Sequence, residues 1–500
     1  MSETGLAAAR NKMEAAGVPT AAIDTFSRFY AMLELGDTGF IREDDIEPLP
    51  QLPRLDDLEI SDSDAAQALG RTAIIKLNGG LATSMGLDAP KSLLPVRQGS
   101  QGEPLTFLDL IVRQVMQARE VTGARLPLIF MNSFRTQEST RAALAAYPQL
   151  PVADGHGGML PMDFTQNREP KLDARSLEPV TWPADPSLEW CPPGHGDLYP
   201  ALHSANIVHR LLDAGFLYAS VSNADNLGAS PNASIAAWFA ASGAPYAAEM
   251  SLKTPADVKG GQLVVRRSDG RIIQRETAQT HPDDMAVSLD AHRHRYFHTN
   301  NLWFNLTALA AELDRTGGVL ELPLIRNMKT VDPRDKTSTP VVQIESAMGA
   351  AVAVFEGATA IEVPRSRFLP VKTTSDLLVM RSDVYRLDAD WRLAATVEPP
   401  TVTLSSAYTM MGDFDARFPQ GPPSLKQAQS LTVHGQWTFG ADVTVLGQAQ
   451  LPDCGQDGLD GQGSQDGQRG QRGDGSRCGQ VPDGARITEQ GIAEQGVEGV

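Results

Sequence analysis

Three things are scarce in this sequence, and each scarcity excludes a class of protein. Only three cysteines occur in 500 residues, Cys191, Cys454 and Cys478, too few and too scattered for a disulfide framework or a zinc site. No uninterrupted apolar run approaches the roughly 20 residues that span a bilayer. The N-terminal residues lack the basic and apolar regions of a secretory signal. We therefore expect a cytoplasmic protein that does not cross a membrane.

Positive charge is also scarce. The chain has 43 Lys and Arg against 61 Asp and Glu, a formal net charge of −18. Nucleic-acid-binding proteins carry basic patches or a basic domain, so we expect no nucleic-acid partner. An anionic substrate remains compatible with this balance only where positive groups gather locally.

Apolar runs and amphipathic stretches alternate along the centre of the chain. Strands are predicted in the stretches beginning at 71, 126, 216 and 359, and helices in those at 21–35, 105–120, 137–147 and 201–215. Such alternation implies crossover connections and an α/β fold with a mixed, mainly parallel sheet. The loops after these strands are expected along one edge, where ligands bind in such folds. Residues 260–277 differ, and predict two strands joined by a turn at Ser268–Gly270.

Two other regions flank this centre. Residues 1–70 are predicted to form a helical N-terminal segment, residues 71–390 a central α/β domain, and residues 391–500 a C-terminal β-solenoid, because short apolar steps recur between glycines after about residue 425. A Gly/Gln-rich tract at about 454–480 cannot bury enough apolar surface to order itself, so disorder is expected there. An insertion and a shift of reading frame both explain the tract.

The most informative stretch is AIIKLNGGLATSMGLDAPKSLLPV, residues 73–96. It matches neither the Walker A loop nor GxGxxG. Gly79 and Gly80 nevertheless allow the backbone to approach a ligand, and successive amide N–H groups can form an anion-binding concavity. Pro90 fixes the chain before Lys91, whose ammonium group suits a phosphate. A tight turn with a solvated lysine is the alternative that composition leaves open.

This loop resembles the signature loop of the UTP–glucose-1-phosphate uridylyltransferase family. Six further segments resemble that family in order: MNSF (131–134), PPGHGD (192–197), VSNADNLGA (221–229), KTPADVKGG (253–261), HTNNLWFN (298–305) and VPRSRFLPVKTTSDL (363–377). The resemblance implies a Rossmann-like (GT-A-like) nucleotidyltransferase domain and a left-handed β-helix-like C-terminal solenoid. It implies that UTP and glucose 1-phosphate give UDP-glucose and pyrophosphate, with Mg²⁺, by in-line attack on the α-phosphorus.

The resemblance also implies roles for individual residues. Lys91 and Lys372 correspond to two catalytic lysines that contact phosphates, and Asp225 to a magnesium ligand. The nucleotide side is assigned to Leu77, Asn78, Gly79, Gly80, Gln166 and Gly194, and the sugar-phosphate side to His195, Asn223, Gly260, Asn300, Asn301 and Glu345. A glutamine amide offers both a donor and an acceptor to the imide edge of uracil.

Some features depart from this pattern or stay open. Ala82 replaces a glycine common in the signature loop, and Asp88–Ala89 replaces a more basic pair. His292, His294 and His298 are interpreted as a solvated strand face, because no carboxylate cluster accompanies them. A uridylyltransferase for galactose 1-phosphate or N-acetylglucosamine 1-phosphate and a non-catalytic nucleotide-sugar sensor remain the alternatives. Self-association through the C-terminal domain is left open.

Overall fold

The computed structural model describes residues 3–99, 101–254, 257, 260–453 and 479–493. The described chain forms two compact units. The first contains residues 1–80 and 111–368, and the second contains residues 81–110 and 369–500. The domain limits expected from the sequence, at 70 and 390, stay a prediction. Residues 454–478, which hold most of the expected Gly/Gln-rich disordered tract with Cys454 and Cys478, lie outside the described residues.

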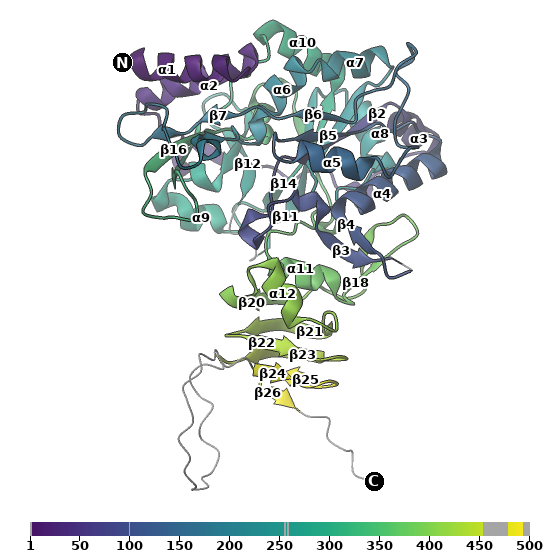
Figure 1. Cartoon of the computed structure of the whole chain (residues 1–500). Coiled ribbons are helices and arrows are strands. Elements are labelled where there is room, and N and C mark those ends of the chain that lie inside the picture. The colour runs from purple at the N-terminus through teal and green to yellow at the C-terminus, as the bar shows by residue number, and fades with distance from the viewer. Residues whose placement is uncertain (1–2, 100, 255–256, 258–259, 454–478, 494–500) are drawn as a thin grey trace, which may run out of the picture. The chain divides into compact units, whose positions relative to one another are not determined.

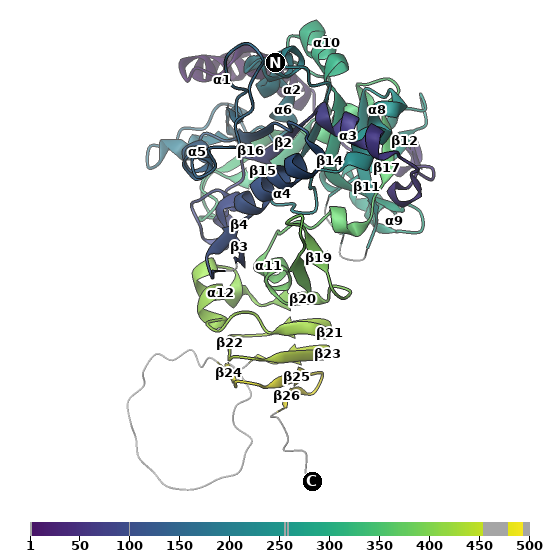
Figure 2. The same cartoon turned by 90° about the vertical axis from the view of Figure 1, so that its right-hand side faces the viewer.

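A seven-stranded sheet lies at the centre of the first unit (Figures 1 and 2), in the order β17-β11-β14-β10-β2-β5-β6. Strands β10, β2, β5 and β6 run parallel to one another, β11 and β17 form a second parallel pair, and β14 is antiparallel to both β10 and β11. The mixed, mainly parallel sheet predicted from the alternation is therefore confirmed. The strands are β2 Thr72–Asn78, β5 Leu128–Asn132, β6 Asp163–Thr165, β10 Tyr218–Asn223, β11 Tyr246–Leu252, β14 Tyr296–Asn305 and β17 Thr359–Glu362.

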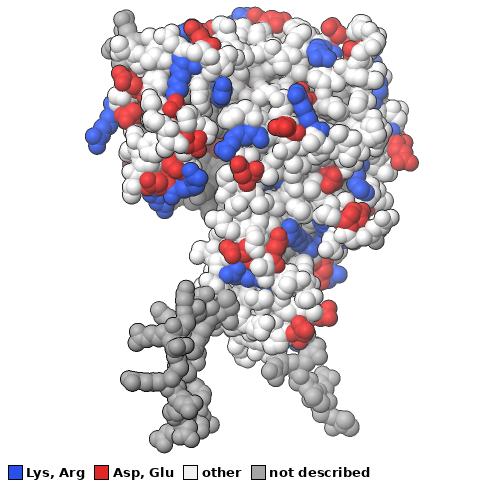
Figure 3. All heavy atoms as spheres, viewed as in Figure 1, with Lys and Arg blue, Asp and Glu red and all other residues white. Residues whose placement is uncertain are grey.

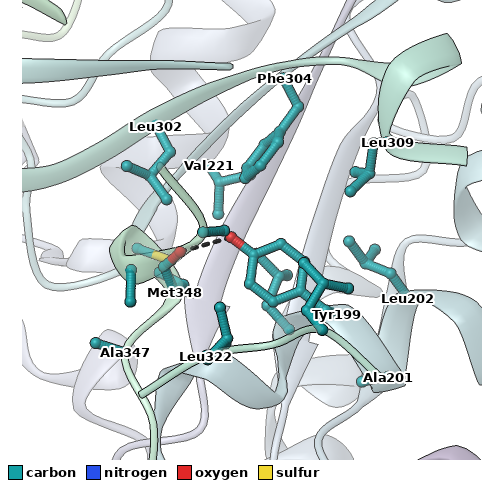
Figure 4. Packing of buried hydrophobic residues seen from close by; sticks show 14 of the residues in the cluster. Tyr199, Ala201, Leu202, Val221, Leu302, Phe304, Leu309, Leu322, Ala347 and Met348 are labelled. Carbon is teal, nitrogen blue, oxygen red and sulfur yellow. Dashed lines mark hydrogen bonds between the residues drawn. The ribbon is translucent and has the colours of Figure 1, made fainter. Parts of the chain in front are cut away.

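Helices on one face of this sheet bury a large apolar cluster of the first unit. Figure 1 shows α1, α2, α6, α7 and α10 together at the top of the unit. Their bounds are α1 Glu3–Ala15, α2 Thr20–Glu34, α6 Leu198–Ser204, α7 Ile207–Asp213 and α10 Leu306–Thr316. Tyr199 lies inside the cluster (Figure 4), where its hydroxyl donates to the Met348 carbonyl at 2.6 Å. This bond satisfies the polar end of a fully buried ring and holds the 3-10 helix η9, Met348–Ala353.

The remaining helices of the first unit are α3 Asp62–Gly70, α5 Gln137–Leu144, α8 Ala233–Ser242 and α9 Met285–Leu289, and α4 Phe107–Thr122 begins in the second unit and ends in the first. The single helix predicted over 201–215 is wrong, because the chain breaks between α6 and α7. Asn206 adopts a left-handed backbone there, with φ of 52°, which ends one helix and starts the next. The hairpin predicted at 260–277 is confirmed as β12 Gly261–Arg266 and β13 Ile272–Glu276, joined by β1 Ile46–Pro48 in a three-stranded sheet.

Short ladders complete the first unit. Strands β15 Ile325–Thr330, β16 Pro340–Glu345 and β8 Leu172–Asp173 form one antiparallel sheet, and β7 Glu169–Pro170 pairs with β9 Trp190–Cys191. Among the described residues, no helix has the length and apolar character that a membrane span requires. On the face that Figure 3 shows, acidic and basic side chains are interspersed. An anion that binds there has to be recognised by individual groups.

The second unit begins with β3 Pro95–Gln98 and β4 Pro104–Thr106 and continues with α11 Thr374–Arg381, β18 Tyr385–Leu387, β19 Leu393–Ala395 and α12 Met411–Arg417. A five-stranded sheet follows, in the order β20-β21-β23-β25-β26, beside the parallel pair β22–β24. These strands are β20 Thr401–Leu404, β21 Ser424–Val433, β22 Trp437–Phe439, β23 Thr444–Leu451, β24 Gly479–Val481, β25 Arg486–Thr488 and β26 Gly491–Ala493.

The C-terminal β-solenoid predicted from the short apolar steps is not confirmed. The described residues give one sheet whose last strand, β26, runs antiparallel to β25, and one separate two-stranded ladder. A solenoid needs the same coil repeated in parallel register. The apolar steps at 431–451 are instead accounted for by the buried sides of β21 and β23, which pair in parallel through Leu431–Ala449 and Val433–Leu451.

Candidate active site

Three parallel strands of the first unit, β2, β5 and β10, end at the same edge of the sheet, and β2 and β10 carry predicted site residues there. Leu77 on β2 pairs with Asn223 on β10, and Asn78 pairs with Asn132 on β5. The Asn78 side chain donates to Asn132 Oδ1 at 2.8 Å and to Thr140 Oγ1 at 2.9 Å. Asn78 is therefore held by buried partners and fixes the end of the strand. The glycines that follow begin the loop at this edge, as predicted.

Gly79 lies against Gln166, the residue assigned to the nucleotide base. A Cβ added at Gly79 would come within 2.4 Å of Gln166 Oε1, so only glycine allows this approach. Gln166 Nε2 donates to the Gly194 carbonyl at 2.9 Å. The structure thus brings together three residues that are far apart in the sequence, and it orients the Gln166 amide between two glycine backbones. Gly80 has open space where a side chain would be.

Gly194 and His195 are fixed by the chain after β16. Gly194 has φ of 76°, and a Cβ there would come within 2.6 Å of the Ser346 carbonyl and 3.1 Å of Glu345 Cβ. His195 Nδ1 accepts a hydrogen bond from the Met348 backbone N–H at 2.9 Å. The neutral ring therefore carries its proton on Nε2, which makes Nε2 a donor. Burial lowers the pKa of His195 to about 4, so the ring is neutral at pH 7.

Two buried carboxyl groups, Asp197 and Glu169, and the half-buried Glu345 belong to the same part of the first unit. Burial raises the pKa of Asp197 to about 7, although the Asn167 side chain and backbone N–H both donate to it, at 2.8 and 2.6 Å. Burial also raises the pKa of Glu169, with the charges of Asp197 and Glu345 adding to the effect. The pKa of Glu345 is raised by burial as well, against the Asn327 hydrogen bond and the charge of Lys329. The carboxyl groups on this side of the site therefore stay protonated to a higher pH than they would in water.

The loop that carries Asp225 stands on a buried polar network that the sequence did not reveal. Arg367 forms two hydrogen bonds with Glu249, at 3.0 and 2.6 Å, and both side chains are almost completely buried. Arg367 Nη1 also donates to the carbonyls of Gly228 and Ser230 at 3.2 and 2.6 Å. The arginine therefore ties the loop after β10 to β11.

Asn301 belongs to the same network. Its Nδ2 donates to Glu249 Oε2 at 3.0 Å, and its Oδ1 accepts from Asn226 Nδ2 at 3.1 Å. Trp303 Nε1 donates to the other carboxylate oxygen of Glu249 at 3.0 Å. The side chain of Asn301 is thus engaged with protein groups, and its neighbour Asn300 is placed differently, with a left-handed backbone at φ of 59°.

Lys76 is a second buried charge that the sequence pattern hid inside an apolar strand. Its Nζ donates to Ser222 Oγ and to the Ala229 carbonyl, both at 2.8 Å. Burial lowers its pKa to about 7, with the charge of Arg367 adding to the effect and those of Glu249 and Asp225 opposing it. Lys76 thus bridges both ends of the loop that contains Asp225.

Asp225 is the residue whose surroundings bear on a metal ion. It follows β10 at the edge where Asn223 ends the strand, and it is partly exposed. No group of three or more His, Cys, Asp and Glu side chains that could hold a metal occurs among the described residues. Mg²⁺ needs no such cage, because it commonly binds through one or two carboxylates together with water and substrate phosphates. The donor set therefore fits a magnesium ion shared with a phosphate.

The interpretation of the three histidines as a solvated strand face is wrong for two of them. His294 and His298 are buried, and only His292 is exposed. Glu43, from the N-terminal segment, reaches His294 Nε2 at 2.9 Å and also pairs with Arg275 and Arg293. A partner so distant in sequence leaves no local signal.

Lys91 and Lys372 both belong to the second unit. Lys91 opens the 3-10 helix η4, Lys91–Leu93, directly after Pro90, and the loop before it closes on itself through the Ala82 N–H and the Ala89 carbonyl at 3.1 Å. Lys372 is exposed and precedes α11, where its backbone N–H donates to Asp376 at 2.8 Å. Thr373 and Asp376 form the capping box that begins this helix. Both lysines are therefore held by ordered backbone on either side.

Comparison with known proteins agrees with this arrangement. The family model described as UTP--glucose-1-phosphate uridylyltransferase matches residues 23–446. A Saccharomyces cerevisiae protein of the same name is 38% identical over 386 residues, 76% of this chain and 73% of its own length, and one from Hordeum vulgare is 37% identical over 396 residues, 78% and 79% of the two chains.

Solved structures agree as well. A structure named UDP-glucose phosphorylase from Trypanosoma brucei has a TM-score of 0.84 at 38% identity and covers 97% of this chain and 100% of its own. A point mutant of UDP-glucose pyrophosphorylase from Leishmania major, in complex with UDP-glucose, has a TM-score of 0.84 at 37% identity and covers 97% and 98%. The alternatives of another sugar and of a non-catalytic sensor are not favoured by these names. Together with the glycine, glutamine and histidine cluster at the sheet edge, they place this chain in the UTP–glucose-1-phosphate uridylyltransferase family.

Proposed function

We propose that this enzyme converts UTP and glucose 1-phosphate into UDP-glucose and pyrophosphate. The observation that carries the proposal is the convergence of Gly79, Gln166 and Gly194 beside His195, at the edge where the parallel strands end. Ligands bind at that edge in open α/β sheets. Relatives of the family bear the name of this reaction, and one related structure is named as a complex with UDP-glucose.

The Gln166 amide recognises uracil in this proposal. Its Nε2 uses one hydrogen for the Gly194 carbonyl at 2.9 Å, which leaves a second N–H and the Oε1 acceptor for the base. An imide edge offers the matching acceptor and donor. Gly79 lets the amide lie close to the backbone, since a Cβ there would come within 2.4 Å of Gln166 Oε1, and Gly194 packs against Ser346, where a Cβ would come within 2.6 Å of its carbonyl.

The sugar phosphate attacks and pyrophosphate leaves. A phosphate oxygen of glucose 1-phosphate forms a bond to the α-phosphorus of UTP, and the bond from that phosphorus to the bridging oxygen of pyrophosphate breaks. Protein groups contribute mainly position and charge in such transfers. His195 donates from Nε2 as a neutral ring, because its pKa is lowered to about 4 by burial. Asn223, Gly260, Asn300 and Glu345 complete the sugar-phosphate side.

Charge neutralisation falls to Lys91, Lys372 and Asp225. We assign the two lysines to the phosphates, and their part rests on the loop sequences in which they stand. Asp225 would hold Mg²⁺ together with phosphate oxygens, and that ion would supply positive charge to the reacting phosphates. Lys76 and Arg367 hold the Asp225 loop through its backbone carbonyls. A cytoplasmic location and self-association through the C-terminal region stay predictions.

Pyrophosphate release tests the proposal. The purified protein is assayed with UTP, Mg²⁺ and a panel of sugar 1-phosphates, with a metal-free sample beside it. Glucose 1-phosphate should give the largest kcat/KM. Release with another sugar alone would change the assigned substrate, and no release with any sugar would favour a nucleotide-sugar sensor.

Lysine variants sharpen the same assay. Lys91→Ala should lower kcat/KM by about 10³-fold, which corresponds to about 4 kcal/mol of transition-state stabilisation. Lys372→Ala should also lower it severely. Lys426→Ala is the matched control, because Lys426 is an exposed lysine of the same unit with no assigned role. Equal activity of the Lys91 variant and this control would remove Lys91 from the site.

A further inference from the structure

His298 on β14 holds the backbone of Asn300. Its Nδ1 lies 3.1 Å from the Asn300 backbone nitrogen and 3.1 Å from the oxygen of the Asn300 side-chain amide. Because a backbone N–H only donates, Nδ1 is the acceptor of that bond. This bond spans two residues within β14, at the point where the register against β11 shifts and Asn300 adopts φ of 59°. Asparagine tolerates that left-handed conformation better than most residues, but the conformation still needs support. His298 provides it from within the strand.

The other ring nitrogen of His298 and one oxygen of Gln274 are both buried and both lack a hydrogen-bond partner among the described residues. Since Nδ1 accepts, the neutral ring carries its hydrogen on Nε2, which is therefore a donor. Gln274 Oε1 is an acceptor. Both side chains lie against Gly349, where an added Cβ would come within 2.2 Å of Gln274 Oε1 and 2.9 Å of His298 Cε1. A complementary donor and acceptor thus face the same glycine.

Gln274 leads from His298 toward Gly260, the second residue assigned to the sugar phosphate. Its Nε2 donates to Glu276 Oε1 on the same strand, β13. Glu276 stands opposite Gly261 in the hairpin, and the next residue, Thr277, binds Gly260 through its N–H at 3.1 Å and its hydroxyl at 3.0 Å. The polar chain therefore begins at Asn300 and ends beside Gly260.

The position of Gly260 suits only glycine. Its φ of 145° is open only to glycine, and a Cβ there would come within 2.4 Å of the Phe297 ring, one residue before His298. Asn300 and Gly260 are both assigned to the sugar phosphate in the proposed function. Asn300 lies on β14 and Gly260 directly precedes β12. The polar side chains between them are His298 and Gln274, whose Nε2 and Oε1 have no hydrogen-bond partner among the described residues.

We propose that His298 and Gln274 are positioning residues that fix Asn300 and Gly260 relative to each other and thereby set the preference for the sugar. In this proposal one buried water accepts the hydrogen of His298 Nε2 and donates to Gln274 Oε1, since the two atoms are not bonded to each other. Neither residue touches the nucleotide side, so the effect is confined to the sugar phosphate. The inference rests on the proposed function.

Steady-state kinetics with separate titrations of UTP and glucose 1-phosphate test this. Losing a net hydrogen bond costs about 0.5–1.5 kcal/mol, so His298→Leu should raise KM for glucose 1-phosphate by up to about tenfold and leave KM for UTP within about twofold. His298→Asn should recover most of the loss, because an asparagine side chain also accepts from an N–H two residues on. His294→Leu is the matched control, since His294 is equally buried but bonded to Glu43.

A double-mutant cycle tests the link between the two residues. If His298 and Gln274 act through one chain, KM for glucose 1-phosphate of the His298→Leu/Gln274→Leu double variant should be little higher than that of His298→Leu alone. The ratio of activity with glucose 1-phosphate to activity with galactose 1-phosphate should fall by a similar factor in His298→Leu, Gln274→Leu and the double variant. Fully multiplied effects, or equal increases in both KM values, would overturn the proposal.

A measurement without substrate separates this proposal from the proposed function. The Asn300 amide should exchange with deuterium at least about tenfold faster in His298→Leu than in wild type or His294→Leu, because it loses its acceptor. Unchanged exchange would refute the His298 bond whatever the enzyme's activity. An inactive wild-type protein with the expected exchange pattern would refute only the proposed function.

Discussion

Removing the Arg367 guanidinium should unfold the first unit at a lower temperature. Arg367→Met would leave Glu249 fully buried without its bidentate partner and would strip the Gly228 and Ser230 carbonyls of a donor. Breaking a buried pair from one side costs about 3–5 kcal/mol. At about 2.1 cal/mol/K of unfolding entropy per residue, a unit of this size should lose about 4–7 °C in Tm.

Differential scanning calorimetry measures the decrease in Tm, and two further variants show whether it comes from the unpaired buried charge. Arg365→Met is the matched control, because Arg365 forms a similar bidentate bond with Asp257 but is partly exposed, so the change should cost about 1 kcal/mol. The Glu249→Met/Arg367→Met double variant should recover part of the stability, because no buried charge is left unpaired. A Tm for Arg367→Met as high as that of the control, or strictly additive losses in the double variant, would refute the reasoning.

Acid should weaken the same pair. Burial by itself raises the pKa of Glu249, but the charge and hydrogen bonds of Arg367, with those of Trp303 and Asn301, outweigh it and leave the pKa below the ordinary value of 4.5. A carboxyl group with a lowered pKa stabilises the folded state above pH 4.5, and this contribution is lost as the pH falls through the folded-state pKa. The Arg367→Met variant should therefore show a smaller drop in Tm below about pH 4.5 than wild type does.

Three other changes have defined outcomes. Asp225→Asn should raise the Mg²⁺ concentration for half-maximal activity by about tenfold, about 1.4 kcal/mol, and an unchanged metal titration would exclude the residue as a ligand. Gly79→Ala should raise KM for UTP, because its Cβ would come within 2.4 Å of Gln166 Oε1, whereas Gly80→Ala, which has open space, serves as its control; equal KM values would contradict the packing argument. Burial raises the pKa of Asp197 from 3.8 to about 7, so the folded state binds an extra proton between about pH 4 and 7 and the stability of the wild type falls as the pH rises through that range. Asp197→Asn should remove this loss of stability. Parallel pH profiles of stability for the two proteins would show that the carboxyl group does not titrate there.

The sequence predicted the parts of the fold whose cause is local. Strands β2, β5 and β10 and the hairpin β12–β13 followed from apolar runs and turn residues, because each pattern is complete within a short stretch of chain. The break at Asn206 escaped prediction because one left-handed residue leaves no periodic trace.

The candidate site was predictable only in part, for the same reason. Gly79, Gln166 and Gly194 stand in recognisable motifs, so they could be assigned before their proximity was known. The roles of the buried polar residues could not be assigned from the sequence, because they depend on partners that are distant in the chain. Lys76 lies within an apolar strand, and only the structure places Ser222 and the Ala229 carbonyl beside its ammonium group.

The second unit is built from two separated pieces of chain, and this matters for how the protein is made. Residues 81–110 are synthesised long before residue 369, at which the rest of the unit begins. At about 5–20 residues per second, the ribosome takes about 13–50 s to cover the interval. During that time β3 lacks α11, although Arg97 on β3 donates to the carbonyls of Arg381 and Ser382 at the end of that helix. The nascent chain must therefore keep residues 81–110 from aggregating while they wait, and a translation product that stops before residue 369 leaves them without their partners.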